Sequence, residues 1–130
     1  MRAAHIIYRA LRAGEMESIR AGDGIVRSER ITTPTQHVMG SKHPANPFVS
    51  TTRSLDSAQF FAMHGGLKPP GSIIAIDLSK VTKPVLDIST PATASAILNH
   101  PRAMNFAVKH REVLIKGGVN SEAIIEVVEE

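Results

Sequence analysis

The chain has 130 residues, of which 42 % are hydrophobic and 21 % charged, and its formal net charge is +3. These values are typical of a single soluble globular domain over residues 1–130 and argue against disorder. There is no cysteine, which excludes disulfides, thiolate metal sites and cysteine nucleophiles, and no apolar stretch approaches the ~18 residues of a membrane span.

The first half of the chain predicts a strand, a short helix and a second strand. Residues 5–10 are rich in β-forming side chains. Residues 15–21 begin with acidic residues and have Arg20 near the end, which suits the helix dipole. Residues 48–52 (Phe-Val-Ser-Thr-Thr) are typical of a strand. Between them, residues 25–47 contain three prolines and are expected to form a long surface segment that carries function.

The second half predicts further short elements. They are a helix over 54–63 with Ser54 as N-cap, strands at 72–78 and 85–88, a helix over 93–98 that Pro101 ends, and strands at 112–115 and 123–128. The last strand includes apolar positions expected to be buried on both faces. Since several connections contain no long helix, we expect an α+β fold with two small, mainly antiparallel sheets.

Several common site patterns are missing from the sequence. The six histidines form no HExxH or closely spaced metal-binding pair, so no metal site is predicted. No glycine-rich phosphate loop and no GxSxG nucleophile motif occurs. With four phenylalanines and one tyrosine, aromatic residues are too few to predict an aromatic, basic nucleic-acid surface. The small basic excess either eases the approach of a polyanion or is an ordinary solvated surface.

Polar residues on the first two strands are candidates for a binding site. Arg9 lies where an apolar strand ends, so its guanidinium either grips a phosphate with two hydrogen bonds or pairs with a surface carboxylate. Strand alternation points Ser50 and Thr52 to one side and Thr51 to the other. Ser50 or Thr52 is thus available to a ligand or to a neighbouring carboxylate.

Glu112 opens a short apolar strand that ends at Gly117-Gly118. A lone carboxylate at this position can accept a hydrogen bond from a ribose hydroxyl and stabilise an oxocarbenium-like centre as a glycosidic bond breaks. The alternative is a glutamate in solvent at the start of a strand.

Together these segments resemble the mono-ADP-ribosyltransferase toxins of the cholera-toxin and pertussis-toxin class, which is named for an arginine, a serine and a glutamate in chain order. The similar segments are Tyr8-Arg9-Ala10, residues 48–52, and Glu112-Val113 followed by Gly117-Gly118-Val119. The resemblance extends from Tyr8 to about Val128. It implies an ADP-ribosyltransferase-like fold, in which the two sheets form an NAD cleft flanked by short helices.

The resemblance also implies roles for these residues toward NAD, the substrate. Arg9 would bind a phosphate of NAD and brace the site. Ser50 would hold the catalytic glutamate and the nicotinamide-side ribose, with Thr51 and Thr52 in support. Glu112 would hydrogen-bond the ribose 2′-hydroxyl and stabilise the oxocarbenium ion as nicotinamide leaves.

Two histidines bear on the resemblance. His37 lies in a His-x-x-Gly segment similar to one that precedes the serine strand of cholera toxin, so it is either a cofactor-binding residue or a polar loop histidine. His110 stands where many members carry Glu or Gln, two residues before the catalytic glutamate. This departure argues against transfer to arginine. His110 is an acceptor-side candidate, as a base toward a hydroxyl, a base amine or water, or it is a solvent-exposed loop residue.

The predicted function is therefore that of an NAD-dependent mono-ADP-ribosyltransferase toxin or effector domain, with a protein or a nucleic acid as acceptor. One alternative is an NAD glycohydrolase toxin that depletes NAD, and another is a non-catalytic NAD-binding module. The absence of cysteine suits direct delivery into the cytoplasm of a target cell, as in bacterial competition, where a cognate immunity protein would be a further partner.

Overall fold

The computed structural model describes residues 5–12, 14–26, 48–64 and 71–129. The helices are α1 (Glu15–Arg20), α3 (Leu55–His64), α4 (Pro91–Ile97) and α5 (Pro101–Lys109), with the 3-10 helices η1 (Leu78–Lys80) and η2 (Ser121–Ala123). The strands are β1 (Ile6–Ala10), β2 (Ile25–Val26), β3 (Phe48–Thr52), β4 (Ile73–Asp77), β5 (Val85–Asp87), β6 (Glu112–Lys116), β7 (Gly118–Val119) and β8 (Ile124–Glu129).

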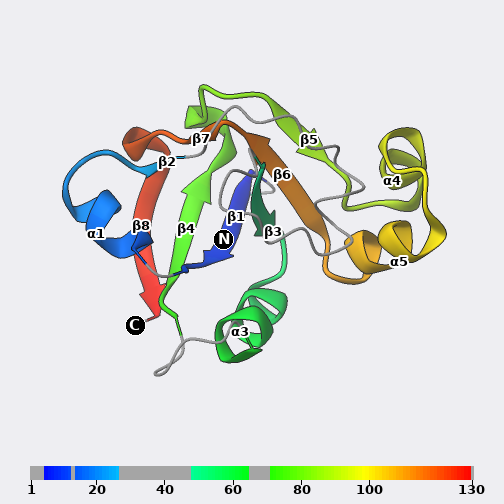
Figure 1. Cartoon of the computed structure of the whole chain (residues 1–130), viewed down its shortest axis with the longest axis horizontal. Coiled ribbons are helices and arrows are strands. Elements are labelled where there is room, and N and C mark those ends of the chain that lie inside the picture. The colour runs from blue at the N-terminus through cyan, green and yellow to red at the C-terminus, as the bar shows by residue number, and fades with distance from the viewer. Residues whose placement is uncertain (1–4, 13, 27–47, 65–70, 130) are drawn as a thin grey trace.

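The strands form two antiparallel sheets (Figure 1). The larger sheet has six strands in the order β5-β6-β3-β1-β4-β8, and β2 pairs with β7 in a second sheet of two strands. Every strand pairing is antiparallel. The predicted α+β class with antiparallel sheets is confirmed.

One face of the six-stranded sheet packs against α1 and the small sheet. Its buried side chains include Ile7, Val49, Ile74 and Val113, and Met16 of α1 packs against them. Because side chains alternate along a strand, the neighbouring residues of these strands point to the opposite face.

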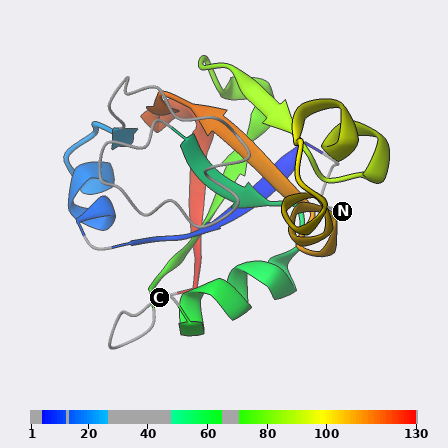
Figure 2. The same ribbon diagram turned by 45° about the vertical axis from the view of Figure 1, so that its right-hand side comes forward.

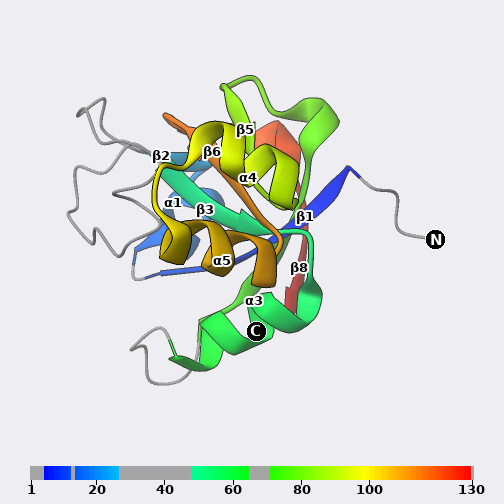
Figure 3. The same ribbon diagram turned by 90° about the vertical axis from the view of Figure 1, so that its right-hand side faces the viewer.

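Two separate helical layers cover that opposite face (Figure 2). α3 packs on β1 and β4, where Ala58 of the helix lies in one cluster with Tyr8 of β1 and Ala75 of β4. α4 and α5 pack near β6 through a cluster that includes Ala103 and Leu114. Turning the molecule shows α5 next to α3, with the strands behind them (Figure 3). The segment of β3 and β6 between the two layers carries Ser50, Thr52 and Glu112.

The helix starts agree in part with the sequence predictions. Ser54 caps α3 as predicted, since its Oγ accepts a hydrogen bond from the Ser57 amide at 3.2 Å. α4 begins at Pro91, two residues before the predicted start, behind a capping box made by Thr90 and Thr93.

Two sequence predictions need correction. Pro101 was expected only to end a helix, but it is also the first residue of α5, a helix that was not predicted. The last strand, β8, was expected to be buried on both faces, but it is an edge strand, and Ile125 and Val127 are exposed. Apart from β2, the predicted surface segment at 25–47 lies outside the residues described. Within the described ranges, no helix has the length and hydropathy needed to cross a bilayer.

Candidate active site

Glu112, the first residue of β6, lies on the sheet face that the two helical layers cover. The strand register places it directly opposite Thr52 of β3, which in turn lies opposite Tyr8 of β1. Residues that face each other across antiparallel strands point to the same side. Glu112 therefore shares its face with Thr52 and Tyr8, and only 2 % of it is exposed. The interpretation as a solvent-exposed strand-start glutamate is wrong.

Burial dominates the electrostatics of Glu112. Loss of hydration raises the pKa of its carboxyl to about 7, and a hydrogen bond with the Ser50 side chain opposes this rise in pKa. Within the described part of the chain, Glu112 Oε1 is the one buried side-chain oxygen or nitrogen that has no hydrogen-bond partner. Such an orphaned oxygen is costly unless it serves a ligand or a reaction. A hydroxyl-bearing ligand would satisfy it.

The hydroxyls of β3 divide as strand alternation predicts. Ser50 points to the side of Glu112, and its hydrogen bond reaches that carboxyl. Thr51 points to the other side, where its hydroxyl donates to the Val113 carbonyl at 2.7 Å. Thr52 donates to the carbonyl of His110 and accepts a hydrogen bond from the Ser54 amide. The two threonines therefore fix the strands and helix ends around Glu112, and a direct contact with NAD stays a prediction.

Arg9 braces the other side of β3. Its guanidinium is buried and forms a two-pronged pair with Glu15 of α1, with Nε–Oε1 at 3.1 Å and Nη2–Oε2 at 2.8 Å. Nη1 donates to the Ser50 carbonyl at 2.6 Å. β1 and β3 share the single register pair Tyr8–Thr52, so the arginine satisfies a strand carbonyl beyond the point where the two strands pair. Contact between Arg9 and a phosphate stays a prediction.

Glu15 belongs to the site, although the sequence did not predict this. It was expected only as an acidic residue at a helix start, where it suits the dipole. It is buried, and its Oε1 also accepts the Arg12 amide at 2.8 Å. The two acidic residues of the first turn, Glu15 and Glu17, carry no sequence difference that distinguishes the buried one from the exposed one.

His110 follows α5 and is buried rather than exposed in a loop. Its ring lies against three phenylalanines, with centroid distances of 4.7 Å to Phe106, 4.8 Å to Phe61 and 5.7 Å to Phe60. Its Nδ1 lies 3.2 Å from the Oγ of Ser57. Burial, with a smaller effect from Lys109, lowers the pKa of His110. Burial therefore favours the neutral ring.

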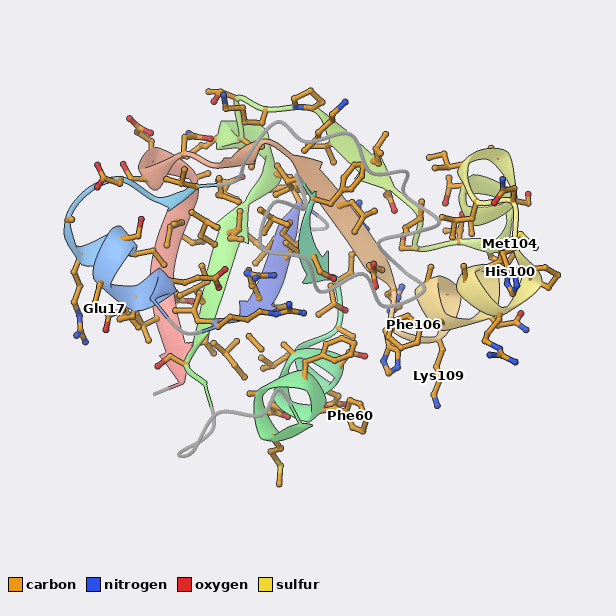
Figure 4. The ribbon with its side chains drawn as sticks, viewed as in Figure 1. Glu17, Phe60, His100, Met104, Phe106 and Lys109 are labelled. Atoms are coloured by element: carbon orange, nitrogen blue, oxygen red, sulfur yellow. The ribbon has the colours of Figure 1, made fainter. Side chains whose placement is uncertain are left out.

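The aromatic cluster was not expected from composition. Three of the four phenylalanines gather around His110, so a small aromatic surface does exist. Figure 4 shows Phe60 of α3 and Phe106 of α5 on facing sides of the space between the two helices. The spacing of Phe106 and His110, four residues apart, was the one available sequence signal.

A tight turn joins His110 to Glu112. Arg111 adopts a left-handed conformation with φ of 49°, and its carbonyl accepts the Arg53 amide at 3.0 Å. Arg53 in turn pairs with Asp87 at 2.7 Å. Two peptide units limit the Cα atoms of His110 and Glu112 to about 7 Å apart, so the aromatic cluster borders the buried carboxylate.

His37 lies outside the residues that the structure describes. In the described ranges, no group of three or more His, Asp or Glu side chains lies together as a metal site would require.

Comparison with known proteins places the fold. Residues 4–130 match a family described as "Domain of unknown function (DUF7587)". None of the curated proteins matches the sequence. Among solved structures, EcPltA is similar with a TM-score of 0.68 and 18 % identity, covering 99 % of this chain and 77 % of that one. A variant of the Scabin toxin from Streptomyces scabies is similar with a TM-score of 0.58 and 19 % identity, covering 98 % of this chain and 65 % of that one.

The full-length CARDS toxin is also similar, with a TM-score of 0.62 and 13 % identity over 95 % of this chain, which spans 24 % of the toxin. These neighbours are ADP-ribosyltransferase toxins. At such identities the likeness establishes the fold, and the predicted ADP-ribosyltransferase-like fold is confirmed.

Proposed function

The chain belongs to the DUF7587 family, and we propose from its fold and its candidate active site that it is an NAD-dependent mono-ADP-ribosyltransferase of the Arg-Ser-Glu class. The observation that carries this proposal is Glu112. It is a buried carboxyl with a pKa of about 7 and an unpartnered oxygen, in a fold shared with ADP-ribosyltransferase toxins. We also propose that the domain is a secreted or delivered effector acting in a target-cell cytoplasm.

In the proposed reaction the Glu112 carboxylate accepts a hydrogen bond from the 2′-hydroxyl of the nicotinamide-side ribose. Its charge stabilises the oxocarbenium character at C1′ as the bond to nicotinamide breaks. Nicotinamide leaves with the electron pair of that bond, and an acceptor nucleophile attacks C1′ and loses a proton.

The surrounding residues position this carboxylate. Ser50 orients Glu112 through its hydrogen bond and favours the ionised form that the reaction needs. Arg9, paired with Glu15, holds the backbone of β3 at Ser50. Both the Ser50 contact and the Arg9 contact are present without NAD, so the Glu112 carboxylate is already positioned to stabilise the transition state.

The cluster around His110 favours transfer over hydrolysis. Phe60 is 49 % exposed and Phe106 38 % exposed, and exposed apolar patches mark interaction surfaces. A water acceptor would not need such a surface. We therefore propose transfer of ADP-ribose to a macromolecular acceptor, with hydrolysis of NAD as the second candidate function.

The test is the variant Glu112→Ala, assayed with adenylate-labelled NAD and whole-cell lysate. We expect label transfer and nicotinamide release to fall about 100-fold or more, as removal of one charge-stabilising group does in other enzymes. Glu17→Ala, which removes the exposed acidic residue of α1, is the matched control and should retain both activities.

Each result separates the alternatives. A folded Glu112→Ala protein with unchanged transfer contradicts the proposal. Release of nicotinamide by the wild type without any labelled macromolecule indicates a glycohydrolase. NAD binding without nicotinamide release indicates a binding module.

A further inference from the structure

The surface beside Glu112 is an aromatic cluster formed by Phe60, Phe61, Phe106 and His110. Phe60 stacks on His110 with an interplanar angle of 20°, and Phe61 contacts Phe106 with ring centroids 6.1 Å apart. The rings come from α3, α5 and the residue after α5. Two of them, Phe60 and Phe106, present partly exposed ring surface to solvent.

The charges around this cluster are mostly positive. Lys109 and Arg111 flank His110 and are exposed, and Arg102 lies one helical turn before Phe106 on α5. α5 contains no acidic residue, and the one acidic residue of α3 is Asp56. A cationic acceptor such as an arginine or lysine side chain would be repelled here, whereas a polyanion would be attracted.

We infer, on the basis of the proposed function, that the acceptor is a base of a single-stranded nucleic acid, which stacks on Phe60 and Phe106 beside His110. Phenyl rings bind bases through their faces, and nearby cations hold the phosphate backbone. The Arg111 turn keeps this surface next to Glu112, so a stacked base lies within reach of the sugar that Glu112 holds. A single strand is required because a base in a duplex presents no free face.

The transfer step balances with the residues present. A nitrogen of the base forms a bond to C1′ while the bond between C1′ and nicotinamide breaks, and nicotinamide leaves with that electron pair. The proton of the attacking nitrogen passes to Nε2 of His110. Ser57 holds Nδ1, and within the described residues no hydrogen bond uses Nε2.

The experiment gives the wild-type protein adenylate-labelled NAD with a single-stranded DNA, an RNA of the same sequence, or a nucleic-acid-free protein extract. We expect label on at least one of the two oligonucleotides, removed by nuclease and resistant to protease. Transfer should weaken as salt rises, because phosphate contacts are screened. Label that appears only in the protein extract, removed by protease, would overturn the inference.

Failure of this inference can be told apart from failure of the proposed function. Nicotinamide release that Glu112→Gln abolishes, without label on either oligonucleotide, overturns the nucleic-acid acceptor and leaves the proposed function standing. Absence of any nicotinamide release overturns both.

Variants of the cluster supply a second test. Phe60→Leu and Phe106→Leu keep apolar volume but remove the flat face, so each should raise the KM for the oligonucleotide about tenfold, the effect of one lost stacking contact. Met63→Leu changes another exposed residue of α3, one that carries no aromatic ring, and should leave this KM unchanged. An equal KM in all three variants would contradict the stacking role, and circular dichroism checks that each variant is folded.

Discussion

Arg9 and Glu15 form a buried, two-pronged ion pair whose guanidinium also donates to the Ser50 carbonyl. The pair links β1, α1 and β3, and its hydrogen bond from Arg9 to Ser50 joins residues 41 positions apart in the sequence. Because Ser50 in turn contacts Glu112, the position of the candidate catalytic carboxylate depends on this ion pair.

Breaking the pair should destabilise the protein and impair the site. Glu15→Gln removes the negative charge that Glu15 places beside the buried guanidinium, and we expect a loss of about 3 kcal/mol in the free energy of unfolding. Arg9→Lys keeps the charge but loses the fork, so it should also be destabilising. Urea denaturation measures both. Glu17→Gln, an exposed residue of the same helix, is the control, and an equal loss there would contradict the role of Glu15.

The pKa of Glu112 predicts the pH dependence of activity. The ionised carboxylate is the active form, so kcat/KM for nicotinamide release should rise with pH and level off above about 7. Ser50→Ala removes the hydrogen bond that lowers this pKa and should shift the midpoint to higher pH. Ser95→Ala, an exposed serine of α4, should not move it. A midpoint near 4.5, the ordinary value for glutamate, would exclude Glu112 as the titrating group.

The same pKa predicts a pH-dependent effect on stability. The folded-state pKa of about 7 lies above the ordinary value of 4.5, so the native state binds more protons than the unfolded state between these pH values. Stability therefore falls as pH rises from 4.5 to 7. Above pH 7 the buried carboxylate costs about 3 kcal/mol.

Glu112→Gln removes this cost. The variant should be more stable than the wild type at pH 8 and nearly equal to it at pH 4, as measured by chemical denaturation at both values. A stabilisation of the same size at the two pH values would show that ionisation of Glu112 is not its cause.

The candidate site was predictable from the sequence where it depends on one strand. Alternation along residues 48–52 placed Ser50 and Thr52 on one side and Thr51 on the other, as the structure has them. The burial of Glu112 was not predictable from its position, because it results from the helices that cover both sides of the site. The contact between Ser50 and Glu112 depends on the register between β3 and β6, which strand patterns alone do not specify, so only the family resemblance implied it.

Contacts between distant elements were missed for the same reason. Glu15 and Glu17 are equivalent as acidic residues of a helix start, and only the approach of α1 to β1 distinguishes them. The aromatic cluster required α5, which was missed because Pro101 was taken as the end of one helix and not as the start of the next. Without α5, Phe106 and His110 had no predicted relation to α3.

Two glycines before β2 offer a matched pair of substitutions. Gly22 and Gly24 both have positive φ, at 85° and 66°, but a Cβ on Gly22 meets no atom within 4 Å, whereas a Cβ on Gly24 would lie 2.1 Å from the carbonyl oxygen of Val119. Gly22→Ala should cost about 1 kcal/mol from backbone strain alone. Gly24→Ala should cost about 3 kcal/mol or more, because β2 must move away from β7. Equal losses in urea denaturation would contradict this close approach.

Ser57 is predicted to position His110 rather than to bind NAD. Its Oγ lies 3.2 Å from Nδ1, and loss of one such hydrogen bond is worth about 1 kcal/mol, so Ser57→Ala should lower kcat for acceptor labelling about fivefold. The pH profile of labelling should change as well, because the hydrogen bond helps fix which ring nitrogen carries the proton. Ser57→Thr keeps a hydroxyl and should restore most of the rate. If alanine and threonine variants lose activity equally, or if neither does, the Ser57 hydroxyl has no role in placing the imidazole.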